Sequence, residues 1–152
     1  MKKIILLVTS TVLTVAILFT ACNKTKMYAN RLDGGEWHIT ELSVDGVTEA
    51  ELPHWQIGEC DAYKESCTGD WENHEGGKGK FAWQFREKGN KFEISNQSEL
   101  TGEHKQDEAI LQCQNFSGVY EVKEHKKKSM TFETSSAVGF SGKKVVMKIE
   151  KE

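Results

Sequence analysis

The sequence predicts an all-β protein, folded as a single antiparallel up-and-down β-barrel of about eight strands. Apolar residues alternate with polar ones over short segments, which is typical of strands with one buried face. Gly, Asn and Lys separate these segments as turn residues, and Pro occurs once, at Pro53. No segment keeps amphipathic helical spacing beyond two turns. Eight antiparallel strands in chain order can close into a barrel, which leaves no strand edge exposed.

The first two strands are predicted on either side of a hairpin turn. An alternating segment covers residues 37–42, and Asp45-Gly46 follows it as a strong hairpin sequence. The second strand is expected at residues 54–60, where Trp55 and Ile57 share one face.

The clearest alternation in the chain lies at residues 80–86, where Phe81, Trp83 and Phe85 share one face. Lys88-Gly89-Asn90 then forms a turn into a strand over residues 91–96. The later strands are expected at residues 109–114, 119–123, 130–134 and 145–149.

Residues 1–21 are predicted to be a secretory signal peptide. Met-Lys-Lys precedes an uncharged stretch from Ile4 to Phe19, which is shorter than the about 20 residues that a membrane span needs. The sequence Leu-Phe-Thr-Ala-Cys-Asn at residues 18–23 resembles the lipobox of bacterial lipoproteins. The alternatives are an ordinary signal peptide with an incidental Cys22, and an uncleaved anchor.

The lipobox resemblance implies a lipid-anchored protein of the bacterial cell envelope. Cys22 is then the first residue of the mature chain and carries acyl chains such as palmitate, and two or more chains make anchoring stable. Asn23 suggests delivery to the outer membrane, on its periplasmic or its surface face. Residues 22–31 then form the lipidated N-terminus and a tether, and residues 32–152 form the barrel domain.

The charge of the mature chain argues against nucleic acid as a partner. The full chain has 20 basic and 23 acidic residues. Removal of Lys2 and Lys3 with the signal peptide leaves 18 basic residues and a formal charge of −5. A nucleic-acid-binding domain needs a basic face, so this class of partner is not expected.

The opening of the first strand, Gly35-Glu36-Trp37, resembles the Gly-x-Trp motif of the lipocalins and the wider calycin group. With the closing Lys-Val-Val-Met-Lys-Ile-Glu-Lys at residues 144–151, behind a lipobox, the layout is similar to that of bacterial lipocalin-like lipoproteins. The resemblance implies a barrel whose floor is formed by Gly35 and Trp37. It also implies a late cation, from Lys143 or Lys148, over the Trp ring.

Three cysteines remain once Cys22 is assigned to the lipid, and the compartment is oxidising. Cys60 and Cys67 enclose a short loop and are expected to form a disulfide, which stabilises by roughly 2–3 kcal/mol in the chain-entropy model. Cys113 is then the odd cysteine. Its pairing with Cys60 or with Cys67 is the alternative.

No metal and no other cofactor is expected. A zinc site would combine Cys60, Cys67 and Cys113 with a histidine, but no two of these ligands have the usual spacing of about two to four residues. The acidic segment at residues 59–75 lacks the spacing of an EF-hand calcium loop and is expected to be a solvated loop.

The sequence contains no motif of a catalytic site. Gly-x-Ser-x-Gly, His-Glu-x-x-His and phosphate-binding loops are absent from it. Its five histidines lie outside any recognisable nucleophile motif. We therefore expect a protein that is not an enzyme.

Large aromatic residues give the positive indication of function. Trp55, Trp83, Phe85, Phe92 and Phe132 are candidate walls of a cavity for a small hydrophobic ligand. The alternative is that the same rings fill the interior, because an eight-stranded barrel is just wide enough to be filled by its own side chains.

Two functions remain open at this point. The first is a membrane-anchored lipocalin-like barrel that binds a small hydrophobic ligand in the envelope. The second is a ligand-free, filled barrel that acts as a protein-interaction or inhibitor module on another envelope protein. Its contact surface is expected at the loops 60–75 and 98–107, with an exposed aromatic patch around Trp71 and Phe140.

Overall fold

The computed structural model of the chain describes residues 24–33, 36–61, 66–99 and 107–151. Within these ranges the strands are β1 (Glu36–Val44), β2 (Val47–Thr48), β3 (His54–Ile57), β4 (Cys67–Glu72), β5 (Lys78–Arg86), β6 (Lys91–Asn96), β7 (Gly118–His125), β8 (Ser129–Thr134) and β9 (Val145–Lys151). The helical elements are residues 24–32, the α-helix α2 (Glu108–Asn115), and the 3-10 turns η1 (Glu87–Gly89) and η3 (Val138–Phe140).

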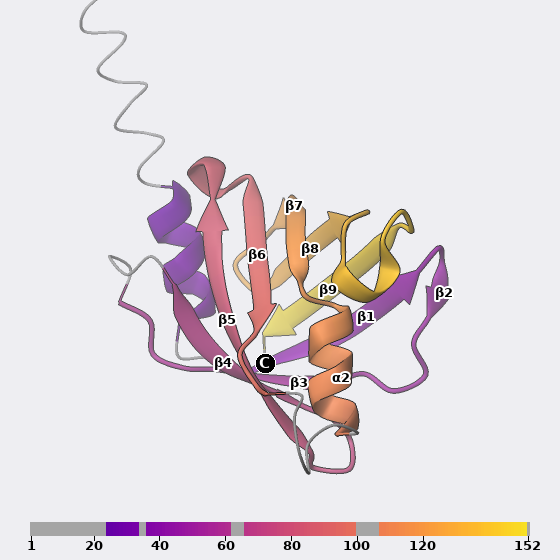
Figure 1. The fold of residues 1–152 in the computed structure, drawn as a ribbon. Coiled ribbons are helices and arrows are strands. Elements are labelled where there is room, and N and C mark those ends of the chain that lie inside the picture. The colour runs from indigo at the N-terminus through magenta and orange to yellow at the C-terminus, as the bar shows by residue number, and fades with distance from the viewer. Residues whose placement is uncertain (1–23, 34–35, 62–65, 100–106, 152) are drawn as a thin grey trace, which may run out of the picture.

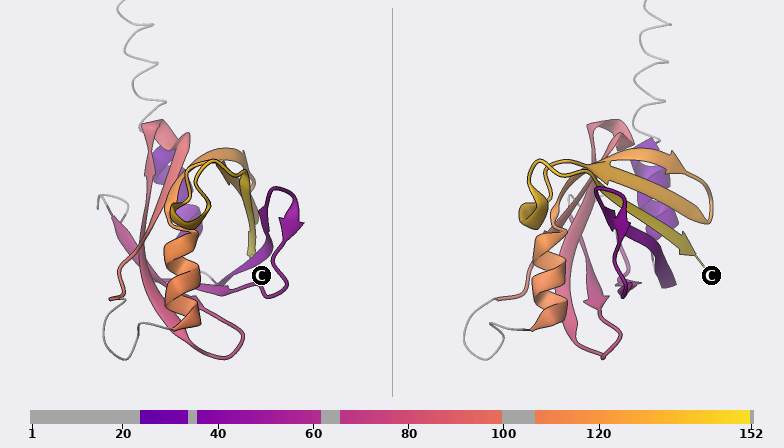
Figure 2. Two further views of the ribbon diagram at one scale, coloured as in Figure 1. Left: turned by 45° about the vertical axis from the view of Figure 1, so that its right-hand side comes forward. Right: turned by 90° about the vertical axis from the view of Figure 1, so that its right-hand side faces the viewer.

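The strands close into an antiparallel barrel. Each strand pairs with the next in the order β1, β3, β4, β5, β6, β7, β8, β9, and β9 pairs back with β1. The two-residue β2 pairs with β1 outside this closed set of eight. Figure 1 shows the sheet curving from β4 and β5 round to β9 and β1, and Figure 2 shows the same curvature from two further sides. The predicted fold class is confirmed.

Alternation of side chains places the core inside the barrel. In β5 the side chains of Phe81, Trp83 and Phe85 are buried, and the residues between them are more exposed. β6 matches this pattern, because Phe92 lies opposite Phe85 and Ile94 lies opposite Trp83. A slip of one residue would turn either set of apolar side chains towards water, so the alternation fixes the register.

β4 lies in the segment that was predicted to be an acidic solvated loop. Cys67, Gly69 and Trp71 are buried, and the residues that alternate with them are acidic or polar and face outward. Asp70 pairs with Lys80 of the neighbouring β5, with its Oδ1 at 3.3 Å from the Lys80 Nζ. The loop prediction was wrong because the carboxylates belong to the outer face of a strand whose inner face is apolar.

Residues 109–114, predicted to be a strand, form α2 instead. The Asp107 carboxylate caps this helix, because its Oδ1 accepts hydrogen bonds from the backbone N–H of Ala109 at 3.0 Å and of Ile110 at 3.3 Å. Ala109, Ile110 and Cys113 are buried, which is the spacing of one helix face. A short apolar run fits a strand as well as a helix, so the cap decides between them.

Helix α2 covers one end of the barrel, beside the end of β4 and the start of β5 (Figure 1). Gly79 permits the close approach, because a Cβ there would lie 3.3 Å from the Ile110 Cα. The indole N–H of Trp71 donates to Gln112 Oε1 at 2.9 Å. Phe116, at the end of the helix, stacks on Trp71 with ring centroids 6.2 Å apart.

The helix at residues 24–32 packs at the opposite end of the barrel. Its buried side chains are Tyr28 and Leu32, which follow the i, i+4 spacing of one helix face. The Tyr28 ring meets Phe85 edge-on with centroids 5.6 Å apart, and the Tyr28 hydroxyl is hydrogen-bonded to His125 Nε2.

This helix corrects the predicted tether at residues 22–31. From residue 24 the segment belongs to the folded domain, because two of its side chains are buried against the barrel. The predicted signal peptide, Cys22 and Gly35 lie outside the described residues. Within the described ranges, no helix is both long and apolar enough to cross a membrane.

Candidate functional site

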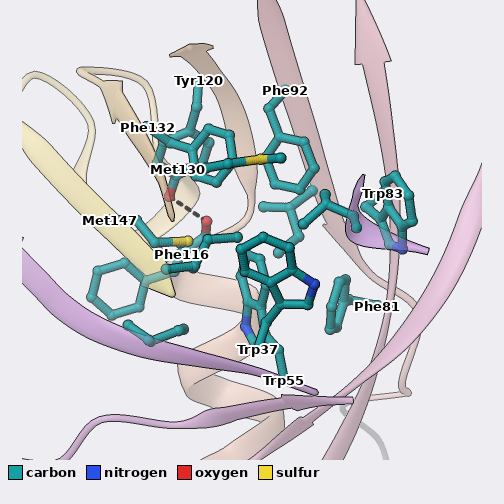
Figure 3. Close-up of a cluster of buried hydrophobic side chains, with 14 of the residues drawn as sticks. Trp37, Trp55, Phe81, Trp83, Phe92, Phe116, Tyr120, Met130, Phe132 and Met147 are labelled. Carbon is teal, nitrogen blue, oxygen red and sulfur yellow. Dashed lines mark hydrogen bonds between the residues drawn. The ribbon is translucent and has the colours of Figure 1, made fainter. Parts of the chain in front are cut away.

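Three tryptophans form a row inside the barrel on β1, β3 and β4. Trp37 lies opposite Trp55, and Trp55 lies opposite Trp71, in the register of the strands. None of the three side chains is more than 1% exposed. Figure 3 shows Trp37 and Trp55 among the other rings of the interior. The strand register therefore brings together residues that lie far apart in the sequence.

The burial of Trp71 corrects the predicted aromatic patch. Trp71 is part of this interior row, and Phe140 is partly buried against Phe116 with ring centroids 4.8 Å apart. Trp71 therefore offers no aromatic surface to another protein, and Phe140 exposes only part of its ring.

The five residues predicted to line a ligand cavity meet in the same interior. Phe92 is the centre of this group: its ring centroid lies 4.4 Å from that of Phe132 and 5.1 Å from that of Phe85. Trp83 and Trp55 each lie 6.2 Å from Phe92, measured between ring centroids. The structure brings the predicted set together, in an interior that these rings pack densely.

The four indole N–H groups of the chain divide into two classes. Trp71 donates to Gln112 Oε1, and Trp83 donates to the Thr68 carbonyl oxygen at 3.3 Å. Trp37 Nε1 and Trp55 Nε1 are buried and have no hydrogen-bond partner among the described residues. A buried donor without an acceptor costs about 1–3 kcal/mol, so these two atoms require an explanation.

A late cation does lie over Trp37, but it comes from a residue other than the two predicted. The Nζ of Lys151 lies 5.8 Å from the Trp37 ring centroid. Lys151 is the strand partner of Trp37 across the β1–β9 seam. The lipocalin resemblance thus implied the right kind of contact, and the register of the seam decides which lysine makes it.

A pocket of about 530 Å³ lies along the start of β1 and β3, and its lining includes Trp37, Trp55, His38 and His54. The Nδ1 atoms of His38 and His54 are 2.9 Å apart, so one ring donates a hydrogen bond to the other. Sequence reasoning missed this pair because it depends on the register of β1 with β3. Among the described residues, no group of three or more His, Cys, Asp or Glu is arranged to hold a metal ion.

The disulfide between Cys60 and Cys67 is confirmed. The two Cα atoms are 5.5 Å apart, and the bridge joins the loop after β3 to the first residue of β4. Cys113 is a buried free thiol on α2. The bridge excludes the zinc hypothesis, which needed Cys60 and Cys67 as thiolate ligands.

Two buried groups, one on α2 and one on β7, have raised pKa values. Burial raises the pKa of the Cys113 thiol to about 12. Burial, with a smaller contribution from Cys113, also raises the pKa of Tyr120, whose hydroxyl donates to the Phe116 carbonyl oxygen at 2.5 Å. Both groups therefore stay neutral near pH 7.

No protein-family model matches the chain, and no curated protein matches it. Two solved structures are similar to the chain at low sequence identity. One is the structure of EF1p2_mFAP2b bound to DFHBI, with 10% identity and a TM-score of 0.49, covering 84% of this chain and 99% of that one. The other is the crystal structure of an uncharacterized protein from Bacteroides eggerthii DSM 20697, with 16% identity and a TM-score of 0.42, covering 75% and 96%. The barrel assignment itself comes from the strand pairing of this chain.

Proposed function

We propose that the protein is a lipid-anchored, lipocalin-like barrel of the bacterial cell envelope that binds a small hydrophobic molecule in its interior. The observation that supports a bound ligand is the pair of indole N–H groups, of Trp37 and Trp55, that have no hydrogen-bond partner among the described residues. Both are buried in an interior of aromatic and aliphatic side chains. Ligand sites of this kind combine apolar walls with a few polar groups that orient the ligand.

The two donors define the chemical class of the ligand. A small molecule with an apolar body and at least one acceptor oxygen would accept a hydrogen bond from one or both indoles. Phe81 and Phe92, whose ring centroids lie 5.2 and 6.2 Å from that of Trp55, would contact the apolar body. The protein is proposed to bind this molecule without catalysis.

The anchor is proposed from the sequence. The lipobox resemblance around Cys22 supports lipidation, and Asn23 supports the outer membrane. An anchored carrier or sensor would meet hydrophobic molecules at the bilayer where they are concentrated. Access of an added protease to the protein in intact cells would distinguish the external face of the outer membrane from the periplasmic face.

Indole N–H resonances test the ligand hypothesis directly. The ¹⁵N-labelled protein has four such resonances, and Trp→Phe variants assign them. After addition of a lipid extract of a bacterial cell envelope, we expect the Trp37 and Trp55 signals to shift downfield as their N–H groups gain an acceptor. The Trp71 and Trp83 signals are the internal control, because their acceptors are in the protein.

Two results would count against this function. If the Trp37 and Trp55 signals do not change at a saturating concentration of the extract, no ligand in it offers an acceptor to these two N–H groups. A shift of all four signals by similar amounts would indicate a change of the whole barrel and not a ligand at the two donors.

A second function is favoured by the density of the interior. Rings in it pack with centroids from 4.4 to 6.4 Å apart, which is the spacing of a filled aromatic core. A filled barrel would act through its surface as a protein-interaction or inhibitor module. Val47 and Val138, 72% and 57% exposed, are apolar positions that such a partner would cover. Co-purification of an envelope protein that is lost on Val138→Lys would support this function.

A further inference from the structure

Three segments meet at the barrel end that the helix 24–32 covers, and they are rich in cations. Residues 24–33, 86–91 and 124–129 together contain nine Lys or Arg and three Asp or Glu. The full chain has 20 basic and 23 acidic residues, so acidic residues outnumber basic ones outside these three segments. We call these three segments the basic end.

Contacts between the three segments place their charges on one surface. Gly89, with φ +86°, leaves space for the Tyr28 ring, which would lie 2.8 Å from a Cβ at that position. The hydroxyl of Tyr28 is bonded to His125, and Arg31 Nη1 donates to the His125 carbonyl oxygen at 3.2 Å. Figure 1 shows the helix beside the turn between β5 and β6. The start of the described chain, at Lys24, is therefore fixed at this end.

Lysines of the basic end differ from those elsewhere on the barrel in how they are paired. Lys24, Lys88, Lys127 and Lys128 are exposed and form no ion pair with another described residue, while Lys126 pairs with Glu124. Lys91, also at the basic end, pairs with Glu121. Outside the basic end, carboxylate partners are present in the pairs Lys78–Glu72, Lys80–Asp70, Lys123–Glu121, Lys144–Glu133 and Lys148–Glu150, whereas Lys143 and Lys151 form no ion pair with another described residue. Four of the six lysines that have no ion-pair partner among the described residues therefore lie at the basic end.

We propose that the basic end is the face with which the protein lies on an anionic phospholipid bilayer. The inference rests on the lipid anchor of the proposed function. Cys22 is two residues before Lys24, and two residues span at most about 7 Å, so an acylated Cys22 holds this end against the headgroups. Met27, an exposed apolar side chain on the same helix, would enter the boundary between headgroups and acyl chains.

The negative charge of the whole mature chain does not oppose this contact. Exposed charges are screened beyond about 8 Å at physiological salt, so a headgroup responds to the lysines nearest to it. Each basic residue close to an anionic surface strengthens binding by about fivefold, the equivalent of 1 kcal/mol. In this orientation the helix 24–32 faces the lipid, and α2 faces away from it.

Lysine acylation footprinting on the anchored full chain tests the proposal. The chain is reconstituted in vesicles of phosphatidylcholine alone, or of phosphatidylcholine with phosphatidylglycerol. On the anionic vesicles we expect Lys24, Lys88, Lys127 and Lys128 to be labelled about fivefold more slowly than on the neutral ones. Lys143 and Lys144, at the opposite end, are the internal control and should be labelled equally on both.

Matched charge reversals separate the basic end from general surface charge. Lys127→Glu with Lys128→Glu should restore fast labelling of Lys24 and Lys88 on anionic vesicles. The control, Lys143→Glu with Lys144→Glu, should leave their protection unchanged. Equal protection on neutral and anionic vesicles, or protection at both ends of the barrel, would overturn the proposal, and so would the absence of protection.

Flotation and intact mass distinguish this inference from the proposed function. A chain that carries the lipid mass and floats with both vesicle types, but shows no selective protection, is anchored without the proposed face. A chain that lacks the lipid mass but floats only with anionic vesicles has the face without the anchor. A chain that floats with neither contradicts the face, and its intact mass reports whether the anchor is absent as well.

Discussion

The two tryptophans without an acceptor, Trp37 and Trp55, are the residues on which the ligand hypothesis depends. A phenylalanine at either position would occupy most of the same volume without a polar atom to satisfy. The indole N–H instead places a donor among apolar side chains, at a cost of about 1–3 kcal/mol unless an acceptor is bound. The other two tryptophans have acceptors in the protein, so they serve as controls for the same substitution.

We expect Trp71→Phe to lower the free energy of unfolding by about 1 kcal/mol more than Trp55→Phe in delipidated protein. Both changes remove the same atoms from a buried site, so the cavity terms are similar. Trp71→Phe also removes the hydrogen bond to Gln112, whereas Trp55→Phe removes a donor that has no partner. Urea unfolding measures the difference. An equal or larger loss in Trp55→Phe would mean that the Trp55 indole has a partner within the protein.

The buried thiol of Cys113 should make the fold sensitive to alkaline pH. Its pKa is raised from 9.0 to about 12, so in the unfolded chain the thiol loses its proton at lower pH than in the folded one. The stabilising contribution is complete below pH 9 and is lost as pH rises towards 12, by up to about 1.4 kcal/mol per pH unit. The raised pKa of Tyr120 acts in the same direction above pH 10.

Cys113→Ala isolates the thiol contribution. Between pH 8 and pH 10 we expect the urea midpoint of the parent protein to fall more than that of the variant. The larger part of the Tyr120 contribution, which comes from burial, is common to both proteins. Identical pH profiles would show that Cys113 does not titrate differently in the two states.

At the scale of elements, local sequence determines the strands better than the helices. β5, β6, β8 and β9 have alternation that is complete within each segment, so they were predicted nearly at their observed bounds. β4 was missed because Gly69 interrupts the apolar face between Cys67 and Trp71. A glycine adds no apolar side chain to the pattern, although a Cβ there would lie 2.6 Å from the Phe81 ring.

The two helices could not be predicted because packing on the barrel creates much of their stability. The helix 24–32 has two buried side chains, and a helix of that length is marginal in water on its own. Helix α2 does have a sequence sign, the capping residue Asp107, but the short apolar run after it fits a strand as well as a helix. Its closure of the barrel end also depends on Gly79, which is distant in the sequence.

Removal of the cap tests the role of α2 as a cover. Asp107→Ala leaves the N–H groups of Ala109 and Ile110 without their side-chain acceptor, and we expect a loss of about 1 kcal/mol in unfolding free energy. Asp107→Asn keeps an acceptor oxygen and should lose less. In Asp107→Ala we expect the rate of amide hydrogen exchange to increase more in α2 than in β5. A uniform increase across the barrel would indicate that the helix has no separate stability.

Tyr28 holds the N-terminal helix to the opposite end. In Tyr28→Ala the contacts with Phe85 and His125 are both lost, and we expect trypsin to cleave at Lys24, Lys26 and Arg31 at least about tenfold faster. Tyr28→Phe keeps the ring contact and should stay closer to the parent. Equal cleavage rates in all three proteins would show that the helix is already detached in solution.

At the scale of the whole molecule, the barrel follows from the number of strands and their antiparallel order. The sequence predicts eight strands, and eight strands close the barrel. The agreement in number hides two errors that compensate, because one predicted strand is α2 and β4 is not predicted. Closure itself pairs β1 with β9 across the whole chain, with Trp37 opposite Lys151. This pairing places Lys151 over Trp37, where the lipocalin resemblance implied Lys143 or Lys148.

The two covered ends determine how a ligand can reach the interior. α2 covers one end and the helix 24–32 covers the other, and Trp37 and Trp55 are almost completely buried between them. Entry therefore requires movement of one cover. In the proposed orientation the N-terminal helix faces the bilayer, so its displacement would open the interior towards the lipid.

Native mass spectrometry of the lipid-anchored chain, released from detergent micelles before and after denaturation, tests the central claim. We expect the native protein to carry an additional mass that is lost on denaturation and is recovered in organic solvent. Trp37→Phe combined with Trp55→Phe should reduce the occupied fraction, while Trp71→Phe, whose indole has its acceptor in the protein, should retain it. A parent protein with no additional mass, even after incubation with a lipid extract of the cell envelope, would contradict the carrier and favour the filled interaction module.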